Sequence, residues 1–315
     1  MNEEQLVNWL LQGDVSIQYQ VYRDLLEIDR PDIQDRITSE GWGKLLLSRR
    51  RSNGHWGDRF YQPKWTSTHY TLLDLRNLNP HPDIRVVRES IASVLSHNMA
   101  EDGGIALGPS TAVRSDVCVN GMFLNYSSYF GVEEPYLHSV VDCILGENMP
   151  DGGFNCRFTR SGAEHSSLHT TLSVLEGLYE FLQSGSRYRN AEILKVKQSA
   201  DEFILVHQLF LSDRTGDVIN PSFLKMPYPS RWKYDILRAL DYFRYAMARN
   251  DSRMESALKI ILKKRNKDGT WNMQAAHPGK VHFVMEEAGR PSRWNTLRVL
   301  RVLKHFHNGW ISHST

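Results

Sequence analysis

Apolar residues recur every three or four positions along most of the chain, which is the spacing of one face of an α-helix. Residues 3–11 show this spacing first, and Asp14 can cap a second helix over residues 17–28. Pro31 suits the first turn of a third helix, which we expect to run to about Arg50. No stretch alternates apolar and polar residues for long enough to predict a competing sheet. The pattern therefore predicts an all-α protein.

Two kinds of helix alternate along the rest of the chain. Helices with a charged face are expected at residues 83–97, 133–145, 189–209 and 252–264, and such helices suit the outside of a fold. Their partners carry less charge in their first turns and begin near Trp65, Ser115, His165, Arg231 and Trp294. Residues 17–28 would supply a sixth inner helix and residues 3–11 a sixth outer one. The count is then six helical hairpins.

A glycine turn that leads to an aromatic or aliphatic residue precedes each of the last five inner helices. The turns are Asn53-Gly54-His55-Trp56, Asp102-Gly103-Gly104-Ile105, Asp151-Gly152-Gly153-Phe154, Thr215-Gly216-Asp217-Val218 and Asp268-Gly269-Thr270-Trp271. Trp56 and Ile105 are 49 positions apart, and so are Ile105 and Phe154. Periods of this size are typical of stacked supersecondary units. We expect Trp56, Phe154 and Trp271 to be wedges between hairpins, and we predict one (α/α)6 toroid domain over residues 1–315.

Such a ring would gather the starts of its inner helices at one end, where a pocket is expected. Asp116 and Cys118 open one inner helix, and His165 and His169 share a face of the next, because they are four apart. Oxygen, sulfur and nitrogen ligands of these kinds suit Zn²⁺ with one position left open. The alternative is that Asp116 favours the helix dipole, Cys118 packs and the histidines satisfy buried neighbours. Both interpretations stay open, with His165 as a further ligand or a catalytic base.

Two copies of Pro-Ser-Arg-Trp mark two other helix starts. Arg231 and Arg293 could clamp an anion such as a diphosphate, with Trp232 and Trp294 lining a cavity. The alternative is that the motif starts a helix and that each arginine bonds loop carbonyls, so that both copies play the same architectural role. Asp235 is a candidate general acid or base, or the partner of a neighbouring arginine.

Composition narrows the class of partner. The chain has 38 basic and 36 acidic residues, a formal net charge of +2, which argues against binding nucleic acid through bulk charge. No apolar run approaches the ~20 residues of a membrane span, and the acidic N-terminus does not resemble a secretory signal. Three cysteines are too few for a disulfide framework. We expect a cytoplasmic protein that takes a small apolar or anionic substrate; the sequence identifies no partner subunit.

The glycine turns followed by inner helices resemble the superfamily of squalene cyclases and protein prenyltransferase β-subunits, whose fold is an α/α toroid. In the prenyltransferases an Asp-x-Cys pair and a later histidine hold zinc. Asp116-Val117-Cys118 and the segment His169-Thr170 to Gly177-Leu178 resemble those two motifs. The resemblance therefore implies Asp116, Cys118 and His169 as zinc ligands. The Asp-x-Asp-Asp acid motif of the cyclases is absent from this sequence.

Three functions follow as hypotheses. The first is a zinc-dependent enzyme, a transferase or cyclase, that acts on an apolar substrate such as an isoprenoid in the central cavity. The second is a carbohydrate-active toroid, a hydrolase or lyase, with Asp116 and Asp235 as its candidate carboxylates. The third is a scaffold that binds a ligand or protein without catalysis.

Overall fold

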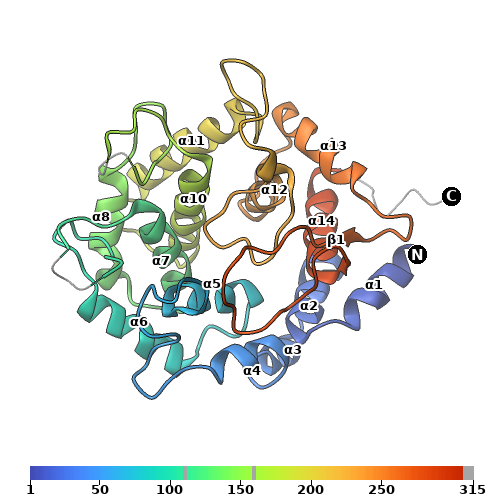
Figure 1. Ribbon diagram of the computed structural model, residues 1–315, viewed down its shortest axis with the longest axis horizontal. Helices are drawn as coiled ribbons and strands as arrows, with labels where there is room; N and C mark the ends of the chain where they lie inside the picture. The colour runs from blue at the N-terminus through green and yellow to red at the C-terminus, as the bar shows by residue number, and fades with distance from the viewer. Residues whose placement is uncertain (109–111, 158–160, 308–315) are drawn as a thin grey trace.

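The chain folds into a ring of helical hairpins, as the sequence predicts (Figure 1). This computed structural model describes residues 1–108, 112–157 and 161–307. Within those residues the six inner helical segments are α2 (Val15–Gln20) with its π-helical continuation (Val21–Leu26), α5 (Thr68–Leu78), α7 (Val117–Tyr129), α10 (Leu168–Gln183), α12 (Ile236–Tyr245) and α14 (Arg293–Phe306). The outer segments are α1 (Glu3–Leu11), α3 (Pro31–Arg36) with α4 (Gly41–Leu47), α6 (Arg85–His97), α8 (His138–Gly146), α11 (Asn190–Val206) and α13 (Glu255–Lys263). The architecture is an α/α toroid.

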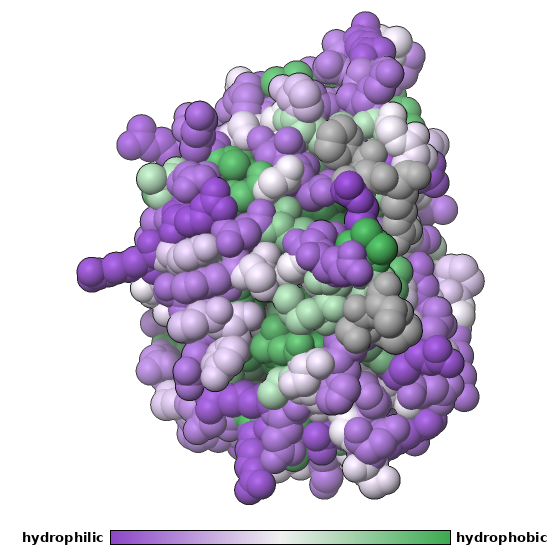
Figure 2. All heavy atoms as spheres, turned by 90° about the vertical axis from the view of Figure 1, so that its left-hand side faces the viewer, coloured by the Kyte–Doolittle hydropathy of each residue, from purple (hydrophilic) through white to green (hydrophobic). Residues whose placement is uncertain are grey.

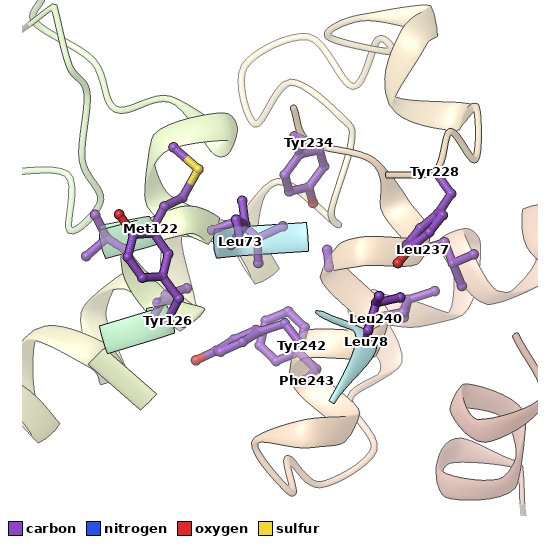
Figure 3. Close-up of a cluster of buried hydrophobic side chains, with 14 of the residues drawn as sticks. Leu73, Leu78, Met122, Tyr126, Tyr228, Tyr234, Leu237, Leu240, Tyr242 and Phe243 are labelled. Carbon is purple, nitrogen blue, oxygen red and sulfur yellow. The ribbon is translucent and has the colours of Figure 1, made fainter. Parts of the chain in front are cut away.

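The burial pattern explains which helices lie inside. In α6 the buried residues are Val87, Ser90, Ile91 and Val94, which form a single stripe against the inner ring. In α7 almost every residue from Val117 to Ser128 is buried, so this helix has no face in solvent. Side chains from α5, α7 and α12 fill the interior, among them Leu73, Tyr126 and Leu237 (Figure 3). Figure 2 shows one side of the ring, where hydrophilic residues predominate.

Three of the five glycine turns make the same backbone contact with the inner helix that follows. The backbone N–H groups of Trp56, Phe154 and Trp271 donate to the hydroxyls of Thr68 (3.1 Å), Thr171 (3.0 Å) and Thr296 (3.0 Å). In the second turn Ile105 donates instead to the side-chain carbonyl of Asn120 at 2.7 Å. Trp56, Phe154 and Trp271 are fully buried, which confirms that they are wedges.

Helices α7 and α10 lie closer together than side chains would allow. A Cβ at Gly121 would meet the carbonyl oxygen of Ser173 at 2.6 Å, and a Cβ at Gly177 would meet the carbonyl oxygen of Gly121 at 2.2 Å. Two glycines therefore let the two backbones touch. The contact fixes the relative position of two neighbouring inner helices.

The first and last hairpins close the ring. Arg293 donates from Nε to the carbonyl oxygen of Trp9 at 2.9 Å and stacks on its indole. Deeper in the same seam, Arg301 donates from Nη1 to Gln20 (2.8 Å) and Asp24 (2.9 Å). No helix among the described residues is both long and apolar enough to cross a membrane.

Two long connections cover the end of the ring at which the inner helices start. Residues 207–235 and 273–290 lie across its middle in Figure 1. The second connection joins β1 (Trp271–Asn272) to β2 (Pro291–Ser292), a two-residue antiparallel pair. The indole Nε1 of Trp65 donates to the carbonyl oxygen of Pro278 at 2.7 Å, which anchors that connection to the start of α5. The candidate site lies beneath these connections.

Candidate functional site

One hollow among the described residues is an open groove of about 420 Å³, here called the surface groove. It is lined by Pro63, Lys64, Trp65, Trp232, Lys233, Pro278, Gly279 and Lys280. The Lys64 ammonium lies 4.9 Å from the ring centroid of Trp65 and 5.1 Å from that of Trp232. The Lys233 ammonium lies 5.8 Å from the Trp232 ring. Aromatic faces and cations therefore alternate along the groove.

Beneath the surface groove lies a smaller hollow of about 70 Å³, here called the inner cavity, which shares Trp65 with it. Its polar lining consists of Asp74, Tyr228, Arg231, His277, His282 and Glu286. Glu286 accepts hydrogen bonds from Ser292 and from the backbone of Trp294, and His282 contacts the hydroxyl of Thr71 at 2.8 Å. These two groups are therefore held by the protein itself.

The other polar groups of the inner cavity are incompletely satisfied. Among the described residues, Asp74 Oδ1, Arg231 Nε, the Tyr228 hydroxyl and His277 Nε2 are buried without a hydrogen-bond partner. Buried polar atoms are nearly always paired in native proteins, and each unpaired one costs about 1–3 kcal/mol. A cluster of them around one hollow points to a place where a ligand supplies the missing partners.

Burial sets the protonation states in the inner cavity. It raises the pKa of Asp74 to about 6, against the opposing charge of Arg231, whose Nη2 lies 3.7 Å from Asp74 Oδ2. It raises the pKa of Tyr228 well above its ordinary value, so that the hydroxyl keeps its proton. Burial and the nearby cations lower the pKa of His277 to about 4, so that its imidazole is neutral at pH 7. The cavity thus holds a proton donor, a neutral base and a cation.

Arg231 is held in an unusual position. Its backbone has φ of +57°, in the left-handed region that residues with a side chain rarely adopt. Its guanidinium lies over the Trp65 ring at 4.6 Å, and its side chain is 5% exposed. Strained backbone of this kind concentrates at binding and catalytic sites, where the surroundings enforce it.

The innermost hollow, here called the central cavity, has a volume of about 110 Å³ and shares Tyr228 and Arg231 with the inner cavity. Its charged lining consists of Arg23, Arg76, Arg231, Arg238, Arg244, Arg298 and Arg301 with Glu176 and Asp241. Arg238 forms a bidentate pair with Glu176 at 2.9 and 2.6 Å. The middle of the toroid is therefore strongly charged.

The residues of the expected zinc site lie at the starts of two inner helices, α7 and α10. Asp116 precedes the first turn of α7 and Cys118 lies within it. His169, in the first turn of α10, accepts the backbone N–H of Tyr234 at Nδ1 (2.7 Å), so its proton is on Nε2. The described residues contain no group of three or more His, Cys, Asp or Glu placed to hold a metal ion. Zinc dependence stays a prediction.

Cys156, which the sequence interpretation left out, is the neighbour of Cys118. The Cys118 thiol hydrogen-bonds Cys156 and lowers its pKa to about 7, although burial acts in the opposite direction. The hydroxyl of Thr170 lies 3.3 Å from the Cys156 sulfur. The two thiols join the glycine turn of one hairpin to the inner helix of the preceding one.

The other candidate residues separate into two groups. Trp232 lines the surface groove, Trp294 lines the central cavity, and Arg231 lines both buried cavities. Asp235 caps α12 by accepting the backbone N–H of Arg238 at 2.8 Å, and it lines none of the three hollows. His165 also lies outside them, because it is exposed and its Nε2 contacts Arg214 at 2.9 Å.

The expectation that the two Pro-Ser-Arg-Trp copies play the same role is wrong. Ser292 caps α14 directly, so Arg293 is the first residue of that helix and bonds Trp9. The second helix of the pair starts only at Ile236, after the cap Asp235, so Arg231 lies in the preceding loop. The helix thus starts five residues later than in the other copy, and Arg231 lines the cavities instead.

The prediction of the site from helix starts does not include the lysines of the groove or most arginines of the ring interior. One pattern in the sequence indicates the charged ring interior. Charged residues recur at helical spacing within inner helices, as in Asp241 and Arg244 or Arg298 and Arg301. On a helix expected to be buried, such a stripe marks a polar channel.

Comparison with known proteins supports the fold. No protein-family model and no curated protein matches the chain. Among solved structures it is similar to a polysaccharide lyase, with a TM-score of 0.51 and 15% identity over 91% of this chain and 86% of that one. It also matches a type II terpene cyclase from Scytonema solved with geranylgeranyl dihydroxybenzoate, with a TM-score of 0.35 and 12% identity over 90% and 98% of the two chains. The likeness to the lyase shows a shared α/α toroid and nothing of the chemistry.

Proposed function

We propose that this protein is a carbohydrate-active enzyme that cleaves an acidic oligosaccharide by β-elimination. The observation that carries the proposal is a cavity of unpartnered polar groups that shares Trp65 with a groove of tryptophans and lysines. Tryptophan faces stack on sugar rings, while lysines and arginines attract carboxylates. The solved polysaccharide lyase of the same fold adds support by analogy only.

The residues suit the steps of an elimination on a uronate. In such a reaction the C5–H bond breaks, the C4=C5 double bond forms, and the C4–O4 bond breaks. Arg231 would pair with the carboxylate and so acidify the C5 proton. The neutral imidazole of His277 would take that proton at Nε2, and the Tyr228 hydroxyl would give one to the leaving O4. Asp74 would hold the Arg231 guanidinium in place.

The cavities favour the anionic rather than the apolar class of substrate. Pockets for apolar ligands are lined mainly by apolar side chains. The inner and central cavities are instead lined by several ionised side chains. An isoprenoid chain would have to leave these charges without water or partners, which costs several kcal/mol per ion.

The test is turnover of acidic polymers. Purified protein is incubated with polygalacturonate, alginate or neutral dextran, and the conjugated double bond of the product is followed by ultraviolet absorbance. We expect a signal with a uronate polymer, none with dextran, and loss of the signal in Tyr228→Phe and His277→Gln. Absence of both turnover and binding with every uronate polymer would refute the proposal.

Binding is tested separately from turnover. The double variant Lys64→Ala/Lys233→Ala should weaken binding of the uronate polymer at least tenfold, because it removes two groove cations. The matched control Lys44→Ala/Lys195→Ala removes the same charge from exposed outer positions and should bind as the wild type does. Equal losses in both double variants would mean that net charge, and not the groove, attracts the polymer.

Zinc binding by Asp116, Cys118 and His169 is a second proposal, motivated by the closeness of Asp116 and Cys118 at the start of α7. Elemental analysis of protein purified without chelators tests it. About one equivalent of zinc in the wild type, lost in Cys118→Ala and His169→Ala, would support it. No zinc in the wild type would end it.

A further inference from the structure

The end of the central cavity away from Arg231 carries more positive than negative charge. Five arginines are grouped there: Arg23, Arg76, Arg244, Arg298 and Arg301. Only three carboxylates form ion pairs with them among the described residues: Asp24, Glu180 and Asp241. Five guanidiniums against three carboxylates leave an excess of two positive charges. Asp235 is not counted among these carboxylates. Its charge acts on Arg298, but it caps α12 and forms no ion pair with Arg298.

The shortage of negative charge is concentrated at Asp241. This single carboxylate is shared by Arg244 at 3.0 Å, Arg298 at 3.6 Å and Arg301 in a short bidentate contact. Burial, and then the charge of Arg301, lowers the pKa of Arg244. Buried charge without a counterion is costly, so the cluster favours an additional anion.

Two hydrogen-bond donors of this cluster are unused. Nε of Arg76 and Nε of Arg244 are buried without a partner among the described residues. Both guanidiniums lie against the ring of Tyr245, at 5.5 and 5.6 Å from its centroid, so they flank the same side chain. Arg76 is already paired with Glu180 through Nη2, and its Nε remains to be satisfied.

We propose that this half of the central cavity binds a dianionic oxyanion group, a phosphate or a sulfate. Guanidinium forks match the geometry of such groups, and two negative charges would balance the excess of two. The volume of about 110 Å³ is several times the ~10–15 Å³ that one water molecule needs, so the central cavity admits a small oxyanion. The proposal does not rest on the proposed function, because it concerns a different set of residues and a different ligand.

The local backbone supports a binding role. Arg23 and Asp24 lie on the π-helical segment Val21–Leu26, which continues α2. π-helical turns are rare and are frequently found at functional sites. Here the wider turn accompanies the placement of Arg23 and of the Asp24 carboxylate that pairs with Arg301.

The test is calorimetric titration of the full chain with phosphate, sulfate and nitrate at constant ionic strength. We expect saturable binding of about one phosphate or sulfate per chain, and at least tenfold weaker binding of the monoanion nitrate. Phenyl phosphate distinguishes a free ion from the terminal group of an organic ligand. Tighter binding of phenyl phosphate supports an organic phosphate, and weaker binding supports the free ion. No saturable binding of any dianion by the wild type overturns the proposal.

Variants locate the site. Arg244→Gln and Arg76→Gln each remove one unused donor and one charge, and each should weaken phosphate binding at least tenfold. Arg85→Gln is the control, because its side chain is 91% exposed on α6 and, within the part of the chain that the structure describes, it pairs only with Glu89. If both cavity variants fold and bind phosphate as tightly as the control, the anion binds elsewhere and the proposal is wrong. If either variant fails to fold, the titration of the wild type with phosphate, sulfate and nitrate still tests the proposal.

Discussion

Replacing Tyr228 with phenylalanine should raise stability and abolish turnover. The hydroxyl of Tyr228 is buried without a partner, so the variant loses only an unsatisfied polar group, a gain of about 1–3 kcal/mol. Unfolding entropy is about 2.1 cal/mol/K per residue, or about 0.7 kcal/mol/K for 315 residues. The expected rise in the thermal midpoint is therefore about 1.5–4 °C. Thermal unfolding followed by circular dichroism measures it.

Tyr242→Phe is the matched control, because it removes a hydroxyl from another buried tyrosine of the ring interior (Figure 3). The Tyr242 hydroxyl donates to Asp201 Oδ1 at 2.8 Å. Losing a hydrogen bond to a charged group should cost about 1.5–3 kcal/mol and lower the midpoint by about 2–4 °C. The reasoning is refuted if both variants fall by similar amounts, since Tyr228 would then have a partner of its own.

Two further predictions concern packing and titration. Gly121→Ala should destabilise the fold by about 1–3 kcal/mol in denaturant titrations, because the added Cβ would collide with the backbone of α10. Gly146→Ala is the control: an added Cβ there meets nothing within 4 Å, so the variant should be neutral or slightly stabilising. A loss of the same size at Gly146 would show that the close contact is not the cause. Alkylation of Cys156 by iodoacetamide should reach half its maximal rate near pH 7, and Cys118→Ala should move that midpoint upward, because it removes the Cys118 thiol that stabilises the thiolate. An unchanged midpoint would contradict this contact.

Most of the fold could be predicted from the sequence. Glycine turns at a regular period and an alternation of charged and uncharged helix starts were enough for the α/α toroid, since these patterns reflect which faces are buried. Helix bounds differed mainly at the starts. For example, α10 begins at Leu168 rather than at His165, which leaves His165 in an exposed loop. His165 therefore lies before the helix and does not share a helix face with His169.

The candidate site was less accessible to sequence reasoning. The sequence named Arg231 as a candidate, but its partner Asp74 comes from a helix more than 150 positions earlier, and Lys280 comes from a loop without a motif. Such pairs are decided by how the ring closes and by which loop covers it. No local pattern encodes them.

Closure of the ring by Arg293 and Arg301 has a consequence for how the protein unfolds. In an open stack of repeats the terminal unit has one neighbour and can fray alone, so stability declines toward each end. Here the first hairpin has a neighbour on both sides, and no unit is terminal. Detaching any hairpin breaks two interfaces at once, which favours one cooperative transition and similar amide protection in every inner helix.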